Sequence, residues 1–529
     1  MSALSSASSL QTRFSKDLRQ LTDRTPQGSS LKKRSFQTIT KQLFEGSEET
    51  NNKPLIDQVS EAELSSFLND HLIQILLQNF TDQKEKIREL SFTLAIKLVT
   101  HKSLTSFDYS DFFTNYIKIF QVAFQPNSPN QFTEEAEEIR LLLVTLTIKL
   151  LNHDSIIAPT NSEITNNDNN IFNNITSTLT KTLTDTYPEV KRESCLLIVS
   201  LNKKSPLSLR LNCESLIKNI ILNLGHQHSK TRSMSIKGIG FVLVAGNGMD
   251  NIDKLMKDHV FPAFNKLSFD RIASVRQGFI ACLVRVMKHA LTLQQPGNIR
   301  SVYSTVIPKL LTFMVSFFED EMIEVKDLVL DEITGVAEVW YENRELNKNY
   351  TPSAEQQTAD ENAMQVDPPF NMFGNLSLSS IQPTAKSMVT AYFSEMLPSL
   401  LTDVSHWTTN AREQSLLTLN SVVNLNEDVS TINERTYEIV NVLMSCVRDD
   451  EEAIANACRN VAVSLGKKTG KGTAFEILLP KLDGSISGMN TPEKLSCCLD
   501  LLGFVCTEMD ISFLLEFTGK IFKVLTMPT

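Results

Sequence analysis

Apolar residues recur three and four positions apart along most of the chain, the spacing that places them on one face of an α-helix. Residues 171–201 and residues 260–287 show the unit well: an apolar helix, a turn that carries an Asp, and a second apolar helix. In the second helix of the latter stretch, Phe279, Leu283 and Val286 follow this spacing. Because a helix pair cannot bury so broad an apolar face alone, we expect the pairs to stack. The pattern predicts an all-α fold, an α-solenoid of about nine or ten HEAT-type helical hairpin repeats.

A basic residue after a small or β-branched residue marks the second helix of successive units. These basic residues are Arg88, Arg140, Lys191, Arg232, Arg276, Lys326 and Arg412. They are separated by 52, 51, 41, 44, 50 and 86 residues. Repeats of this type run to roughly 40–47 residues, so the longer separations predict insertions. Two insertions are visible, an Asn-rich stretch in residues 151–174 and a loop in residues 345–384.

The Asp of each turn has a structural use. Its carboxylate can accept backbone N–H bonds at the start of the second helix, where the helix dipole also favours a negative charge. Asp185 is the turn Asp of residues 171–201. Because the basic residue lies one turn further along the second helix, we expect it to pair with the Asp of the neighbouring unit. We therefore interpret these pairs as packing contacts between repeats.

The insertions suggest how the chain is organised. We predict N-terminal HEAT-type repeats in residues 1–150, central repeats in residues 151–344, an acidic flexible loop in residues 345–385, and C-terminal repeats in residues 386–529. Two interpretations of the loop stay open. It is either a tolerated surface insertion or a partner-binding segment centred on residues 368–373, where Phe370 and Phe373 interrupt a polar stretch.

Charge and composition exclude several classes of protein. The chain has 51 Lys and Arg against 61 Asp and Glu, a net charge of −10, and no basic stripe, which argues against a nucleic-acid binder. No apolar run approaches the roughly 20 residues of a membrane-spanning helix, and the N-terminus lacks the apolar core of a secretory signal. We therefore expect a cytoplasmic protein with no membrane partner. Its eight scattered Cys, with no CxxC pair, are interpreted as reduced, buried thiols.

Four short segments contain residue types that could carry chemistry. Residues 466–473 contain Gly, Lys and Thr, but no choice of glycines gives the spacing of a phosphate-binding loop, and a helix precedes them. Gly238 with Gly240 indicates helix packing, and residues 246–248 indicate a helix end. His226 and His228 supply only two local metal ligands and are assigned to a turn. We predict no enzyme, with no catalytic, cofactor-binding or metal residues and no cofactor, and we assign no partner-binding residue.

Several segments resemble, in order and spacing, the repeats of the HEAT-repeat axonemal dynein assembly factor family. They include residues 188–195, residues 214–217, His226 to His228, Thr231 with Arg232, residues 246–248, residues 324–326, residues 340–343, residues 396–398 with Asp403 and Trp407, residues 450–452, and Cys458 with Arg459. Their collinearity carries the resemblance, which runs from about Asp185 to Gly466. In two respects the chain departs from the family: His406 stands where an acidic residue is expected, and further repeats are expected after Thr529.

The resemblance implies a cytoplasmic scaffold for preassembly of outer and inner dynein arms, needed for cilium movement. It also implies that the scaffold binds axonemal dynein heavy and intermediate chains together with chaperones and other dynein assembly factors, and that it has no catalytic centre. On physical grounds, stacked pairs offer a long helical surface that can touch a partly folded client at many weak points.

Two other classes share this repeat. A nuclear transport receptor is commonly longer, and the acidic residues here are spread out instead of gathered in one loop. A phosphatase scaffold subunit has more uniform, uninterrupted repeats than the separations above. Binding to the GTP form of Ran, or co-purification with a phosphatase catalytic subunit, would favour the corresponding class.

Overall fold

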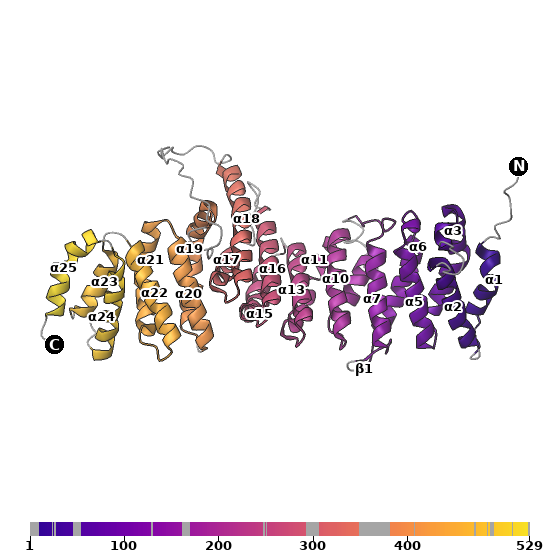
Figure 1. The fold of residues 1–529 in the computed structure, drawn as a ribbon, viewed down its shortest axis with the longest axis horizontal. Coiled ribbons are helices and arrows are strands. Elements are labelled where there is room, and N and C mark those ends of the chain that lie inside the picture. The colour runs from indigo at the N-terminus through magenta and orange to yellow at the C-terminus, as the bar shows by residue number, and fades with distance from the viewer. Residues whose placement is uncertain are drawn as a thin grey trace. The chain divides into compact units, whose positions relative to one another are not determined.

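The fold is a row of antiparallel helix pairs in each of two compact units. A computed structural model describes residues 10–23, 25, 28–45, 54–128, 131–160, 170–246, 249, 251–292, 306–348, 381–406, 408–469, 472–483, 485–486, 491–509 and 511–526. Unit one is Met1–Met249, and unit two is Asp250–Thr529. Figure 1 draws unit one from indigo to magenta and unit two onward to yellow, with successive pairs side by side within each unit.

Unit one contains five helix pairs in its described residues: α1–α2, α4–α5, α6–α7, α9–α10 and α12–α13. Its elements are α1 (Leu10–Leu21), α2 (Ser29–Phe44), η3 (Leu55–Asp57), α3 (Glu61–Phe67), η4 (Leu68–Leu72), α4 (Ile73–Asn79), α5 (Glu85–Val99), η5 (Lys102–Leu104), α6 (Ser110–Ala123), β1 (Pro126–Ser128), β2 (Gln131–Phe132), α7 (Glu137–Leu151), α9 (Ile171–Thr182), α10 (Pro188–Lys204), α11 (Pro206–Leu211), α12 (Cys213–Ile221), η6 (Leu222–Gly225) and α13 (Ser229–Ala245).

Unit two contains five further pairs in the part of it that is described, α15–α16, α17–α18, α19–α20, α21–α22 and α23–α24, followed by α25. Its elements are α14 (Ile252–Leu255), η7 (Met256–Val260), α15 (Phe261–Leu267), α16 (Ala273–Thr292), α17 (Ile307–Ser316), η9 (Phe317–Glu319), α18 (Ile323–Lys348), α19 (Pro383–Val404), α20 (Thr409–Leu425), α21 (Val429–Cys446), α22 (Glu452–Lys468), α23 (Thr473–Leu482), α24 (Pro492–Thr507) and α25 (Ile511–Leu525).

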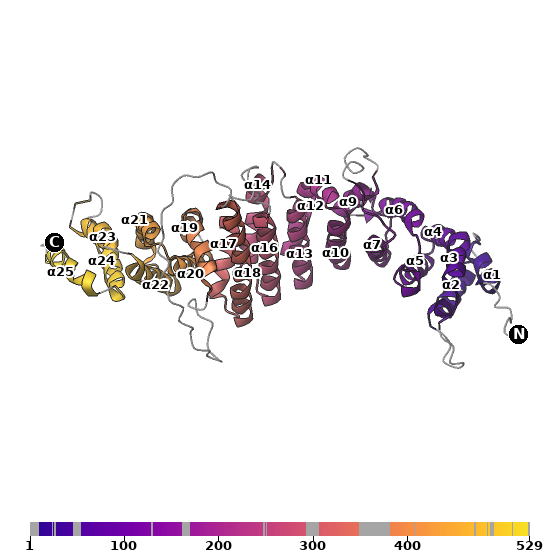
Figure 2. The ribbon, with the colours of Figure 1, turned by 90° about the horizontal axis from the view of Figure 1, so that it is seen from above.

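The helices form two layers within each unit. The second helices of neighbouring pairs pack on one another, as α5 on α7, α7 on α10 and α10 on α13 in unit one, and as α20 on α22 and α22 on α24 in unit two. Within each unit taken by itself, Figure 2 shows these second helices on one side, with first helices such as α6 and α9, or α19 and α21, on the other. The predicted apolar face of α16 is confirmed, since Phe279, Leu283 and Val286 are buried. Each unit is thus an all-α solenoid of HEAT-type hairpins, which confirms the predicted fold class.

Some features depart from the sequence pattern. The interval before α7 holds a small antiparallel hairpin of β1 and β2, which the sequence analysis did not predict. At the expected loop, α18 continues to Lys348 and α19 begins at Pro383, while Phe370 and Phe373 lie outside the described residues. The division into residues 1–150, 151–344, 345–385 and 386–529 stays a prediction. Among the described helices, none is long and apolar enough to cross a bilayer.

Candidate functional site

In eight of the ten helix pairs of the described residues, the turn contains a residue whose side chain accepts the N–H group two residues further on, at the start of the second helix, and we call it the cap residue. In the α9–α10 turn, Asp185 Oδ1 accepts from Tyr187 N at 2.8 Å. Other carboxylate caps, with their distances to that nitrogen, are Asp82 at 2.9 Å, Glu134 at 3.0 Å, Asp270 at 3.0 Å, Asp320 at 2.9 Å and Asp449 at 3.1 Å. The bond satisfies an N–H group at a helix start, where no carbonyl of the helix itself is in reach. The structure thus confirms the predicted use of the turn Asp.

Two turns use histidine as the cap residue. His226 Nδ1 accepts from His228 N at 3.1 Å, and His406 Nδ1 accepts from Thr408 N at 3.2 Å. An imidazole nitrogen therefore replaces the carboxylate oxygen at the same position, which explains how His406 can stand where an acidic residue was expected. The capping bond is retained in both turns, but the negative charge of the carboxylate is lost.

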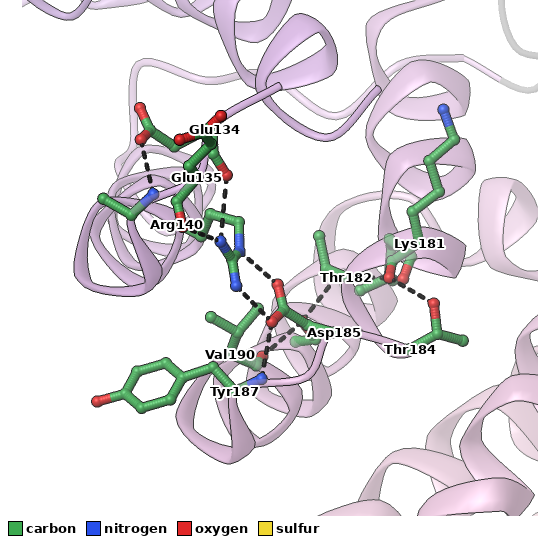
Figure 3. Close-up of polar contacts among 12 residues, drawn as sticks. Glu134, Glu135, Arg140, Lys181, Thr182, Thr184, Asp185, Tyr187 and Val190 are labelled. Carbon is green, nitrogen blue, oxygen red and sulfur yellow. Dashed lines mark hydrogen bonds and ion pairs between the residues drawn. The ribbon is translucent and has the colours of Figure 1, made fainter. Parts of the chain in front are cut away.

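A basic residue joins each carboxylate cap to a neighbouring turn, and Arg140 shows the full arrangement (Figure 3). Its Nη1 donates to the carbonyl oxygens of Glu134 and Glu135, at 3.1 and 2.8 Å, in the turn of its own pair. Its Nε and Nη2 donate to the two carboxylate oxygens of Asp185, at 2.7 and 2.9 Å, in the next pair. We call this double attachment an arginine clamp. It fixes two turns with one planar guanidinium.

The Arg140–Asp185 clamp is buried. The side chains of Arg140 and Asp185 are 6% and 0% exposed. Burial by itself lowers the pKa of the Arg140 guanidinium, but the hydrogen bonds and charge of Asp185, with Glu137 and Glu134, leave that pKa raised overall. The guanidinium therefore stays charged, and its donors are directed at the two turns. Such a group holds structure together and offers no proton for catalysis.

The clamp recurs in both units, and the predicted charge pair with a neighbouring unit is confirmed for Arg88, Arg140, Arg276 and Arg412. Arg276 binds the carbonyl oxygen of Asp270 at 2.6 Å and the carboxylate of Asp320 at 2.7 and 2.8 Å. Arg88 binds its own turn at Asp82 and the carboxylate of Glu134, with 2.8 Å between Nη2 and Oε1. A less complete version pairs Arg412 with Asp449 at 3.2 Å.

Lysine replaces arginine in the two pairs that precede the histidine caps. Lys191 follows Asp185 and comes before the His226 turn, and Lys326 follows Asp320 and comes before the His406 turn. In the first case, an amide crosses between the pairs instead: Asn223 Nδ2 donates to the Leu183 carbonyl oxygen at 2.8 Å. On the sequence alone, Lys and Arg were treated alike, and Asn223 was not recognised. An Asn three residues before a cap residue could have indicated this hydrogen bond between neighbouring pairs.

The glycine segments have structural roles. A Cβ on Gly238 would lie 3.3 Å from Ile198 Cδ1, so α13 approaches α10 closely, as predicted. Gly246 follows the last residue of α13, which confirms the predicted helix end. In residues 466–473, α22 runs to Lys468, and Gly472 has a left-handed φ of 74° before α23. A Cβ on Gly466 would overlap the Val505 carbonyl oxygen at 2.0 Å, which indicates packing of α22 on α24.

The described cysteines and histidines show neither a reactive thiol site nor a metal site. All eight Cys are free, and six are buried, whereas Cys497 and Cys506 are partly exposed. Burial raises the pKa of Cys195 and of Cys282 to about 12, which disfavours the reactive thiolate. Over the described ranges, no three or more His, Cys, Asp and Glu side chains are grouped so that they could hold a metal ion.

One groove in unit two was not predicted. It has a volume of about 490 Å³ and lies between α15, α17, α19 and α20. Phe269, Phe313 and Leu400 contribute apolar surface, and the Lys309–Asp403 ion pair, at 3.3 Å, stands beside them. No local motif could have revealed it, because its lining comes from four helices that are distant in the sequence.

Comparison with known proteins places this architecture in a family. The family described as "Dynein axonemal assembly factor 5-like, TPR repeats" matches residues 27–348. Dynein axonemal assembly factor 5 of Xenopus laevis is 24% identical over 437 residues, which cover 81% of this chain and 46% of that protein. The protein of the same name from Homo sapiens is 25% identical over 299 residues, or 56% of this chain and 31% of that protein. The chain therefore spans less than half the length of these relatives.

Among solved structures, importin beta is 11% identical with a TM-score of 0.36, over 94% of this chain and 56% of that chain. The Kap95:Nup1 complex gives 10% identity and a TM-score of 0.40, over 98% of this chain and 60% of that chain. The length of the repeats can be read from the positions of the cap residues. Successive caps lie 52, 51 and 41 residues apart, at Asp82, Glu134, Asp185 and His226. TPR repeats are about 34 residues long, so these intervals are nearer to those of HEAT repeats.

Proposed function

Because the chain belongs to the dynein axonemal assembly factor 5-like family, we propose that it is a non-enzymatic scaffold for preassembly of axonemal dyneins. The family match over residues 27–348 is the observation that carries the proposal. In this role the chain acts in the cytoplasm, binds dynein heavy and intermediate chains together with chaperones and other assembly factors, and is needed for cilium movement.

The repeat architecture supplies a physical basis for this role. Second helices stand side by side in each unit, so they present a surface made of many equivalent positions. An incompletely assembled subunit that touches several of these positions is held by the sum of weak contacts, and it is released when its proper partner competes for them. The clamps support this surface, because they fix the distance between neighbouring pairs. No nucleotide or covalent step is required.

The proposal is tested by affinity purification of the tagged chain from the cytoplasm of ciliated cells, after the cilia have been removed. We expect dynein heavy or intermediate chains, with chaperones, among the bound proteins. A helical solenoid with no transport or phosphatase role serves as the control bait and removes proteins that bind any repeat surface. Recovery of Ran or of a phosphatase catalytic subunit without dynein chains would contradict the proposal.

The non-enzymatic part of the proposal has its own test. The purified chain, incubated with ATP or GTP, is expected to release phosphate no faster than buffer does. Hydrolysis that persists through several purification steps and rises in proportion to the chain would contradict a purely scaffolding role.

A further inference from the structure

Two adjacent turns in unit two carry exposed apolar side chains beside their cap residues. Phe269, Ile272, Met322 and Ile323 are 43%, 43%, 40% and 54% exposed. We call these four residues the apolar turn surface. At the turns capped by Asp82 and Asp449, the corresponding positions hold polar residues, namely Thr81, Lys84, Glu85, Arg448, Glu451 and Glu452. The apolar side chains are therefore not a requirement of the turn itself.

One clamp brings these two turns together. Arg276 binds the Asp270 carbonyl oxygen at 2.6 Å and the Asp320 carboxylate at 2.7 Å. Ile272 N donates to Asp270 Oδ1 at 3.0 Å, and Met322 N donates to Asp320 Oδ1 at 2.9 Å. Ile272 and Met322 thus occupy equivalent positions on neighbouring turns, roughly 10 Å apart, the distance between packed helices. The distance between the Ile272 and Met322 positions is fixed by the buried Arg276 guanidinium, which binds both turns.

The charge around the apolar turn surface is mainly negative. Carboxylates are Asp270, Glu319, Asp320, Glu321, Glu324 and Asp327, of which Asp320 is buried against Arg276, and basic groups are Arg271, Arg276 and Lys326, with Lys266 and Lys309 on the wall of the adjoining groove. The Glu321 side chain is 77% exposed, although it also lies 3.5 Å from Arg276. Glu324 is exposed on the first turn of α18. A partner that covers Met322 and Ile323 would therefore meet more negative charge than positive charge.

We propose that the apolar turn surface binds a protein segment whose apolar side chains are flanked by Lys or Arg. Burial of Ile, Met and Phe side chains supplies affinity, at about 25 cal/mol per Å² of apolar surface removed from water. The surrounding carboxylates select the basic flanks and speed the encounter. Phe269 also forms part of the wall of the groove between α15, α17, α19 and α20, so the bound segment can extend one side chain into it. This inference does not rest on the proposed dynein role.

The test uses a fluorescent helical peptide of Leu and Lys, about 18 residues long. Its binding to the whole chain is measured by anisotropy, beside a matched peptide of Leu and Glu. The test variant carries Ile272→Asp with Met322→Asp. The control variant carries Val122→Asp with Leu222→Asp, which adds the same charge at side chains that are 50% and 71% exposed in unit one. Both new Asp residues of the test variant lie near helix starts, where a negative charge is tolerated, and circular dichroism checks the fold.

We expect the Leu and Lys peptide to bind about tenfold more weakly to the test variant and within about twofold of the original affinity to the control variant. Glu321→Lys with Glu324→Lys, a second variant that keeps the apolar side chains, is expected to weaken binding as well. The Leu and Glu peptide is expected to bind poorly.

Three outcomes would overturn the inference. The first is equal weakening by the test and control variants, and the second is equal binding of the two peptides. The third is sedimentation that shows self-association of the original chain and its loss in the Ile272→Asp and Met322→Asp variant, because a second copy would then cover this surface.

Discussion

The contact between two neighbouring helix pairs, which we call a joint, is made in different ways at two successive places in unit one. Between the α6–α7 and α9–α10 pairs, Arg140 makes four hydrogen bonds, two of them to the buried carboxylate of Asp185. Between the α9–α10 and α12–α13 pairs, Lys191 takes the place of the arginine and His226 that of the acid. Capping of a helix start and clamping of neighbouring pairs are therefore separable tasks. A histidine performs the first, whereas the second needs a carboxylate and a basic side chain, as in the Arg140–Asp185 pair or the Lys32–Asp82 pair.

The second joint uses uncharged contacts. Asn223 Nδ2 donates to the Leu183 carbonyl oxygen at 2.8 Å, and Asn219 Nδ2 donates to the Thr180 carbonyl oxygen at 3.0 Å. A neutral hydrogen bond is worth about 0.5–1.5 kcal/mol, whereas bonds to charged groups are worth roughly twice that. We therefore expect these two joints to differ in strength, although the helix pairs of unit one look alike in Figure 1.

The largest effect is expected from breaking the clamp. Arg140→Leu leaves the Asp185 carboxylate buried without a partner, and loss of one member of a buried pair costs about 3–5 kcal/mol. Urea unfolding, followed by circular dichroism, measures the loss. Lys191→Leu is the matched control at the second joint and should cost under about 1 kcal/mol, because Lys191 is only half-buried and makes no clamp. Equal losses from the two substitutions would remove the distinction between the joints.

A smaller effect is expected at the amide that crosses the second joint. Asn223→Leu leaves the Leu183 carbonyl oxygen without its donor, at a cost of about 1–3 kcal/mol. Asn219→Leu, at a half-buried position, should cost less. These values come from the same unfolding experiment. If Asn219→Leu proved the more damaging change, the second joint would depend on a contact other than the Asn223 amide.

Two substitutions can give the second joint the same clamp residues as the first. Lys191→Arg together with His226→Asp restores both members of a clamp and should raise the free energy of unfolding by about 1–2 kcal/mol. Either substitution alone should have little benefit, so the gain belongs to the pair and appears as a coupling energy in a double-mutant cycle. A coupling energy near zero would mean that the backbone of this joint holds the two side chains too far apart.

The smallest effect is a dependence on pH. Burial lowers the pKa of His226, and Lys191, His228, Arg192 and Arg232 act in the same direction. The unfolded chain therefore binds a proton at His226 more readily than the folded chain, and stability falls as the pH drops through the ordinary histidine value of about 6.5. His226→Asn keeps a capping oxygen and should flatten this part of the curve, measured by urea unfolding between about pH 7.5 and pH 5.5. An unchanged slope would assign the dependence to another group.

Much of this arrangement could be predicted from the sequence because its parts are local. The turn residue and the basic residue six positions later recur in successive units, so stacking of the units predicted that a basic residue pairs with the Asp of its neighbour, as Arg140 does with Asp185. The helix pairs themselves followed from the apolar spacing, as the buried face of α16 shows.

The remaining features depend on contacts between distant residues. Asn223 reaches Leu183 across 40 positions, and the groove beside Phe313 draws on four helices, so neither has a local pattern. The hairpin of β1 and β2 is three and two residues long, too short for an alternating pattern to emerge. Histidine was not recognised as a cap residue, because its use at His226 and His406 depends on the orientation of one ring nitrogen.

The claim that the two joints differ in strength is tested most directly by native-state hydrogen exchange at two equivalent amides. Tyr187 N–H is held by Asp185 at the clamped joint, and His228 N–H is held by His226 at the unclamped one. We predict a higher free energy of opening for the Tyr187 amide, and a fall to about the His228 level in the Arg140→Leu variant. Equal protection of the two amides in the original chain, or no change at Tyr187 in the variant, would contradict it.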